Sequence, residues 1–206
     1  RVVLDFCPDI DQETDLYRFL QILQQLCAYP KAQNTIQQIF FSMNDNNTSI
    51  YRLALCMLNG QLDLYKVLGS CAKDNELWHF CFMHKLTMQR IPSNDAALQA
   101  LVCYISLVDC GMLKQLLEHV LAIWSKRLSL QKLSQNEHLN LSKLLILTAK
   151  FYYQDKKKGN QDDQDLKRLL HEGLRHHLEW SDALQRHIGM KTVEIIFNIM
   201  SGLRCC

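Results

Sequence analysis

Turn-forming residues are scarce in this sequence, which has only 3 prolines and 7 glycines among 206 residues. Folds rich in β-strands need many tight turns, and those turns draw heavily on glycine and proline. The scarcity therefore argues against an all-β or α/β fold. Leucine, glutamine, lysine and alanine are abundant instead, and all four are good helix formers. The composition predicts an all-α protein.

Long apolar runs and an excess of charge of one sign are also missing. No run reaches the roughly 20 apolar residues that a membrane-spanning helix needs, and no signal peptide pattern is present. The 23 basic and 21 acidic side chains are interleaved rather than gathered into a basic stripe, which argues against a nucleic-acid partner. We therefore expect a soluble protein that binds other proteins. Because the chain starts at Arg1, we also expect it to be a fragment of a longer chain.

Cysteine is plentiful, but nothing in its spacing indicates a disulfide framework. The nine cysteines are odd in number and follow no regular pattern, unlike those of small secreted domains held by disulfides. Several lie inside apolar helical segments, among them Cys27, Cys56, Cys81 and Cys103. We interpret them as reduced, buried thiols of a cytoplasmic or nuclear protein.

Apolar residues recur with the spacing i, i+3, i+4, i+7 in many segments, which is the period of a helix with one buried face. The clearest stripe consists of Leu113, Leu116, Leu117, Val120, Leu121, Trp124 and Leu128. A second stripe runs through Gly189, Val193, Ile196, Phe197 and Met200, and Ile195 and Ile199 widen it. A helix that is apolar over so wide an arc is expected to pack on more than one side.

Helix-ending signals divide the chain into short units. The expected breaks are Pro30, Asn59-Gly60, Pro92 and Asp109-Cys110-Gly111, with a capping box at Ser134 and Glu137 and an N-cap at Ser181-Asp182. These signals predict about nine or ten antiparallel helices, stacked as a HEAT-like solenoid over residues 1–206. A compact irregular bundle is the alternative. Residues 154–165 contain no apolar residue and are expected to form a solvated loop.

His79, Cys81 and His84, with Cys71 nearby, come closest to a zinc-binding pattern. Zinc needs four ligands that converge from fixed spacings, and neither a CxxC nor an HxxxH pair is present here. On an α-helix, Cys81 and His84 share one face, whereas His79 points away from both. We therefore interpret the segment as a packed helix rich in aromatic residues and predict no metal site.

A second cluster consists of His171, His176 and His177, beside Glu172 and Glu179. The apolar stripe of this helix runs through Leu170, Leu174 and Leu178, so the histidines are expected on a solvated face. No Gly-rich phosphate loop, glycine elbow or other catalytic motif occurs in the sequence. The sequence predicts no catalytic residue, no cofactor and no enzyme activity.

Three ordered segments in the second half of the chain resemble a known family. They read LLEHVLAIWSKR (Leu116 to Arg127), NLSKLLIL (Asn140 to Leu147) and a longer stretch from Leu169 to Ile196. Their order resembles the middle region of the telomere-length-regulation protein family, the first subunit of the Triple T chaperone-adaptor complex. The matching positions are Trp124, Ser142, Lys143, Arg186, Gly189, Met190 and Glu194. The chain departs from the family's pattern at His187, where a second arginine is common, and at Lys191, Thr192 and Val193.

The Arg186 to Glu194 signature has a structural interpretation. Gly189 is expected to admit a close helix neighbour, because glycine inside a helix costs up to about 1 kcal/mol against alanine and needs a reason to be there. Met190 is expected to fill an irregular gap and to share a helix face with Glu194. Arg186 is expected to pair with an acid on an adjacent helix or to cap its carbonyls. The alternative is that these residues form a partner surface.

The resemblance implies a scaffold without catalysis. Members of the family bind two companion subunits and phosphatidylinositol-3-kinase-related kinases, and they link these kinases to the ninety-kilodalton heat-shock chaperone. A protein of this kind is expected in the cytoplasm and nucleus, with effects on DNA-damage signalling, nutrient signalling and telomere maintenance. The alternative function is a HEAT-like adaptor subunit of another large protein assembly.

Overall fold

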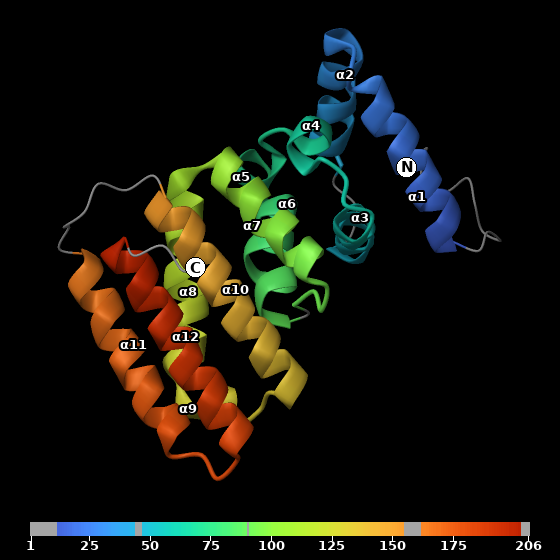
Figure 1. The fold of residues 1–206 in the computed structure, drawn as a ribbon. Helices are drawn as coiled ribbons and strands as arrows, with labels where there is room; N and C mark the ends of the chain where they lie inside the picture. The colour runs from blue at the N-terminus through green and yellow to red at the C-terminus, as the bar shows by residue number, and fades with distance from the viewer. Residues whose placement is uncertain (1–11, 44–46, 90, 155–161, 203–206) are drawn as a thin grey trace.

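The computed structural model describes residues 12–43, 47–89, 91–154 and 162–202 (Figure 1). Every secondary-structure element in these ranges is helical, which confirms the all-α prediction. The longer helices are α1 (Gln12–Leu26), α2 (Pro30–Phe41), α3 (Asn47–Asn59), α7 (Asp95–Val108), α8 (Cys110–Ser125), α10 (Gln135–Gln154), α11 (Asp162–Leu178) and α12 (Ala183–Ser201). The shorter ones are α4 (Leu64–Leu68), α5 (Cys71–Asp74), α6 (Glu76–Phe80), α9 (Arg127–Leu130) and the π-helix η1 (Cys81–Gln89).

The longer helices contact one another in two rows. In the first row α3 packs on α7, α7 on α10, and α10 on α12. In the second row η1 packs on α8, and α8 on α11. Contacts between α3 and η1, α7 and α8, α8 and α10, and α11 and α12 join the rows. Figure 1 shows α10, α11 and α12 running along one another in the C-terminal part, while α1 and α2 form the opposite end of the molecule.

Three expectations about the helices need correction. The expected count of nine or ten is not confirmed, because several connections contain helices of only four or five residues, such as α5 and α9. Leu128 does not extend the stripe of α8: that helix ends at Ser125, and the Leu128 side chain is 75% exposed. The predicted loop at 154–165 is too long at its C-terminal end, since residues 162–165 already belong to α11.

Side-chain caps explain several of the helix starts. The capping box forms as expected, because the Ser134 backbone N–H donates to Glu137 Oε2 at 2.8 Å and the Glu137 N–H donates to Ser134 Oγ at 3.3 Å. Asp109 caps α8 by accepting from the Gly111 and Met112 N–H groups. Asp182, rather than Ser181, caps α12 through the Leu184 N–H. Pro30 lies at the start of α2, where a backbone N–H would have no partner within the helix.

The buried side chains form one continuous core that is rich in leucine and aromatic residues. Its largest fully buried members include Trp78, Trp124, Tyr104 and Phe82. The Trp78 indole N–H donates to the Phe40 carbonyl at 2.8 Å and so joins α6 to the end of α2. The expectation that α12 packs on more than one side is confirmed, because it contacts both α10 and α11.

None of the described helices is both long and apolar enough to cross a membrane.

Candidate functional site

The first two signature residues meet in the core between α8 and α10. Trp124 is fully buried near the end of α8, and its indole Nε1–H donates to Ser142 Oγ at 3.0 Å. Ser142 is buried on α10 and lies 18 positions further along the chain. The bond satisfies the polar edge of the indole inside an apolar core, which a buried tryptophan requires. Ser142 therefore has a structural reason to be a hydroxyl residue.

A third helix adds a buried histidine to this contact. The ring of His177, on α11, stacks on Trp124 with a centroid distance of 4.2 Å and an interplanar angle of 24°. On its other edge, His177 Nε2 lies 2.8 Å from Nε2 of His138, which is on α10. Both histidines are buried. The expectation that His177 belongs to a solvated face is therefore wrong, because this side of α11 faces Trp124. We call Trp124, His138, Ser142 and His177 the Trp–His cluster.

The hydrogen bonds of the cluster fix the tautomers of its histidines. His177 Nδ1 lies 2.7 Å from the Gly173 carbonyl oxygen, which only accepts, so Nδ1 carries the proton. In the neutral ring Nε2 of His177 is then an acceptor, and Nε2–H of His138 donates to it. This leaves Nδ1 of His138 as a buried acceptor without a hydrogen-bond partner among the described residues.

Burial makes both rings of the cluster weak bases. Desolvation, followed by the neighbouring His177, lowers the pKa of His138 from 6.5 to about 4. Desolvation also lowers the pKa of His177, although its bond to the Gly173 carbonyl acts in the opposite direction. Both imidazoles are therefore neutral at physiological pH, in agreement with the hydrogen-bond assignment.

Two glycines allow the helices around the cluster to approach closely. A Cβ placed on Gly189 of α12 would lie 2.5 Å from Cβ of His177, and a Cβ on Gly173 of α11 would overlap the Trp124 ring. Atoms at such separations repel strongly, so a larger residue would push the helices apart. This agrees with the expectation that Gly189 admits a close neighbour.

Arg186 bonds to the turn that follows α11 rather than pairing with an acid or capping the carbonyls of the helix. Its guanidinium Nη1 donates to the carbonyl oxygens of Trp180 at 2.6 Å and Ser181 at 2.8 Å. These carbonyls lie in the connection between α11, which ends at Leu178, and α12, which begins at Ala183. Arg186 therefore closes the turn between α11 and α12.

The remaining signature residues lie on the surface. Met190 is 44% exposed, so the expectation that it fills an internal gap is wrong: it lies on α12 next to Gly189 but faces outward. Glu194 is exposed and pairs with Lys191 on the same helix at 2.7 Å. Lys143 bridges α10 to the first residue of α7 through Asp95 at 2.7 Å. Of the signature residues, only Met190 and Glu194 make no contact between helices that is described here.

The candidate zinc residues do not form a metal site. Among the described residues, no group of three or more histidine, cysteine, aspartate or glutamate side chains could hold a metal ion. His79 does not point away from His84 as expected, since their ring centroids are 6.4 Å apart. The chain passes from α6 into the π-helix η1 between them, and the wider turn brings residues five apart onto one side. Cys81 is buried, and burial raises its pKa to about 12, so it stays a thiol.

The described cysteines are free thiols, but burial is uneven. Cys27, Cys71 and Cys81 are buried, whereas Cys56 and Cys103 are only partly buried, contrary to expectation. Burial raises the pKa of Cys71 to about 12 as well. A protonated thiol is a poor nucleophile and a poor metal ligand, so neither Cys71 nor Cys81 is suited to covalent chemistry.

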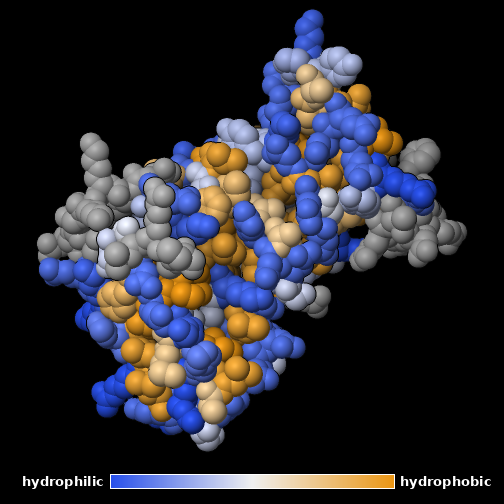
Figure 2. Space-filling model, viewed as in Figure 1, coloured by the Kyte–Doolittle hydropathy of each residue, from blue (hydrophilic) through white to orange (hydrophobic). Residues whose placement is uncertain are grey.

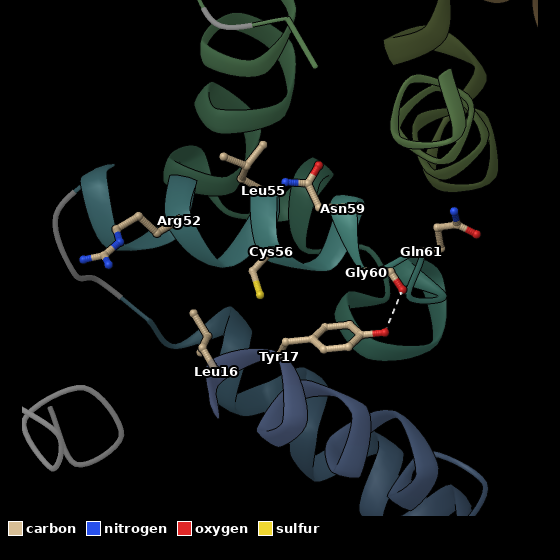
Figure 3. Close-up of a pocket in the computed structure, with 8 residues that line it drawn as sticks. All are labelled: Leu16, Tyr17, Arg52, Leu55, Cys56, Asn59, Gly60 and Gln61. Carbon is tan, nitrogen blue, oxygen red and sulfur yellow. Dashed lines mark hydrogen bonds between the residues drawn. The ribbon is translucent and has the colours of Figure 1, made fainter. Parts of the chain in front are cut away.

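A surface pocket of about 540 Å³ lies between α1 and α3 (Figure 3). It is lined by Leu16, Tyr17, Arg52, Leu55, Cys56, Asn59, Gly60 and Gln61. Tyr17 crosses one end of the pocket, and its hydroxyl donates to the Gly60 carbonyl at 3.4 Å. These eight residues include no histidine and no carboxylate, the side chains that most often act as general acids or bases. The pocket therefore has the character of a packing groove between two helices.

Comparison of the chain with family models, with curated proteins and with solved structures finds no match. The function is consequently argued from the residues and their geometry.

Proposed function

We propose that this chain is part of a non-catalytic helical-repeat scaffold of the Triple T type. Together with companion subunits, such a scaffold supports the chaperone-dependent maturation and stability of phosphatidylinositol-3-kinase-related kinases. The chain would act in the cytoplasm and nucleus and would affect DNA-damage signalling, nutrient signalling and telomere maintenance. It would bind proteins rather than nucleic acid or membrane.

The convergence of three of the seven signature residues is the observation that carries this proposal. Trp124, Ser142 and Gly189 come from three segments spread over 66 positions, yet all three contact one another or His177 in a single cluster. A chance similarity between separate short segments has no reason to converge in space. The pattern that resembles the family therefore has a common physical basis, which is the close packing of α8, α10, α11 and α12.

The two rows of helices support the HEAT-like interpretation. Successive helices along the chain alternate between the rows: α7 and α10 lie in the first, α8 and α11 in the second, and α12 returns to the first. In a helical-repeat array each hairpin contributes one helix to each layer and buries its face against the next hairpin. Such an array offers long outer surfaces for large partners, which is what an adaptor requires.

Co-purification of the full-length protein that contains this chain tests the proposal. We expect an affinity-tagged protein to recover two companion subunits and at least one of the kinases from cells. Depletion of the protein should lower the steady-state levels of several of these kinases while their messenger RNA levels stay constant. Recovery of a different large assembly, with unchanged kinase levels, would instead support the HEAT-like adaptor of another complex.

A further inference from the structure

The connection between α8 and α10 carries positive charge only. Residues 126–132 contain Lys126, Arg127 and Lys132 and no acid, although basic and acidic residues are nearly balanced over the whole chain. We call this range the basic connection. Its serine, Ser129, follows Arg127 by two positions and Lys126 by three. No other serine or threonine in the sequence has lysine or arginine at both of these positions.

The bases of this connection are exposed to a binding partner. Many serine kinases recognise substrates by basic residues two and three positions before the acceptor, which pair with carboxylates in the substrate groove. Lys126 and Arg127 are both exposed, and Figure 1 places α9 at the end of the molecule where the turn between α11 and α12 lies. Leu128 is exposed too, but Figure 2 shows hydrophobic residues at many places on the surface, so an exposed leucine alone marks no partner. The charge pattern is what indicates a kinase.

The hydroxyl group of Ser129 has no structural task, unlike those of the neighbouring serines. Ser125 Oγ donates to the Ala122 carbonyl at 3.3 Å, and Ser134 Oγ belongs to the capping box of α10. Ser129 Oγ forms no hydrogen bond with the part of the chain that the structure describes. The residue is also only partly buried. Its oxygen is therefore available as an acceptor without the loss of a helix cap.

Helix α9 is a short element that can leave its place without unfolding of the chain. A kinase groove binds an extended segment, so the helical turn of four residues has to open for capture. Two side chains hold it: Leu130, which is 1% exposed, and Arg127, whose Nη1 lies 3.1 Å from Oε2 of Glu179 on α11. The ion pair is exposed and therefore weak, so the burial of Leu130 is the main restraint. Elements with few buried contacts open locally more often than the whole chain unfolds.

Phosphoryl transfer to Ser129 needs only Mg-ATP as the donor. Ser129 Oγ forms a new bond to the γ-phosphorus, while the bond from that phosphorus to the bridging oxygen of ADP breaks. ADP leaves with the electron pair, and the hydroxyl proton passes to the catalytic aspartate of the kinase. The product adds about two negative charges beside Lys126, Arg127 and Lys132, so the basic connection changes from three positive charges to about one. The modified residue is therefore placed among cations rather than among acids.

We propose that Ser129 is a phosphorylation site for a basic-directed serine kinase, which captures the basic connection when Leu130 leaves the core. The inference does not depend on the proposed scaffold function, because it uses only α9 and the residues around it. A kinase that reads acids directly after the acceptor does not fit, since the next acidic residue along the chain is Glu137.

The test is phosphorylation of the purified full-length protein by the catalytic subunit of cyclic-AMP-dependent protein kinase, a basic-directed kinase, with Mg-ATP. Mass spectrometry locates and counts the phosphate. We expect nearly complete modification of Ser129, and kcat/KM at this site at least about ten-fold lower in Arg127→Ala, which equals about 1.4 kcal/mol. Ser134→Ala, at the next serine, is the matched control and should stay within about two-fold of the wild type.

A second pair of measurements tests the release of Leu130. Leu130→Ala should speed modification of the folded protein about ten-fold, whereas the same change should not speed modification of a synthetic peptide of residues 121–136. Circular dichroism checks that the variant is folded. If it is not, Glu179→Gln removes only the ion pair to Arg127 and should speed modification about two-fold.

Three results contradict the proposal in distinguishable ways. Phosphate on other residues with none on Ser129 would overturn it, and so would a folded protein that stays unmodified while the peptide is modified. A rate at Ser129 that Arg127→Ala leaves unchanged would show that the bases do not select the kinase. A folded Leu130→Ala variant that reacts no faster than the wild type would show that capture does not require the release of Leu130.

Discussion

The N-terminal helices α1 and α2 differ in charge and side-chain exposure from the C-terminal unit, which consists of α8, α10, α11 and α12. From Phe19 to Phe41 only Lys31 is charged, and several large apolar side chains stay exposed. In the C-terminal unit α11 is heavily charged, and the rings of Trp124, His138 and His177 are buried and hydrogen-bonded. The C-terminal unit therefore buries its central rings, whereas the N-terminal helices leave Phe19, Tyr29 and Phe41 more than one third exposed.

Removing the indole ring of Trp124 from the C-terminal unit should have the largest effect on stability. Trp124→Ala should lower the free energy of unfolding by about 3–5 kcal/mol, because it leaves a large cavity and removes the hydrogen-bond donor to Ser142 Oγ. Urea denaturation followed by circular dichroism measures the change. Leu128→Ala, only four positions away but exposed, should change it by less than about 0.5 kcal/mol. Equal effects of the two substitutions would contradict the packing described for α8.

Acid should weaken the C-terminal unit selectively. In the folded chain the pKa of His138 is lowered from 6.5 to about 4, so the unfolded chain binds more protons between these two values. Stability is therefore complete above pH 6.5 and falls as the pH drops toward 4, by up to about 1.4 kcal/mol per pH unit for one fully shifted group. The lowered pKa of His177 acts in the same direction.

Melting curves recorded from pH 7.5 to pH 4 follow this loss. His138→Phe keeps an aromatic ring in the cluster but removes the titrating group, so its stability should depend less steeply on pH. Leu128→Ala, at an exposed position outside the cluster, removes no titrating group and should leave the slope of the wild type unchanged. An identical slope in all three proteins would show that the buried pair does not control the acid response.

Gly189→Ala tests whether close packing outweighs helix propensity at this position. On an isolated helix, Gly→Ala is stabilising by about 1 kcal/mol, but the methyl would press on His177. We expect a net destabilisation of about 1–2 kcal/mol, since overpacking costs about 1–3 kcal/mol. Met190→Ala, at the next and exposed position, should have little effect on denaturation. A stabilised Gly189→Ala variant would mean that α11 and α12 are not closely packed.

The smallest effect is expected from the surface part of the signature. Lys143 and Asp95 form an ion pair whose side chains are partly exposed, so Lys143→Ala should cost no more than about 1 kcal/mol, and less at high salt. Thermal melting at low and high salt measures this. Lys143→Ala that keeps its stability but recovers less partner would assign this residue to an interface.

Local signals in the sequence predicted the helix boundaries well. The capping box at Ser134 and the break at Asp109 depend on side chains that bond to nearby backbone groups, so adjacent residues contain the information. The stripe that includes Trp124 was predicted for the same reason, but it was extended to Leu128 because periodicity alone does not show that Lys126 ends the helix.

Contacts between distant segments were less predictable. The spacing of Leu170 and Leu174 predicts a solvated position for His177. Nothing nearby in the sequence indicates Trp124 or His138 as its neighbours. The position of His79 was misjudged because an α-helical period was assumed where the chain enters a π-helix. A signal that could have revealed the cluster was the pair of glycines on the last two helices, each of which marks a close approach.

The stacking of Trp124 on His177 has an optical consequence. The chain has only three tryptophans, and Trp124 and Trp180 both lie beside the imidazole pair, while Trp78 stacks on the phenyl ring of Phe82. A charged imidazolium draws electron density from an excited indole and quenches its emission, whereas a phenyl ring does not. Intrinsic fluorescence therefore reports the protonation of one end of the molecule without any attached dye.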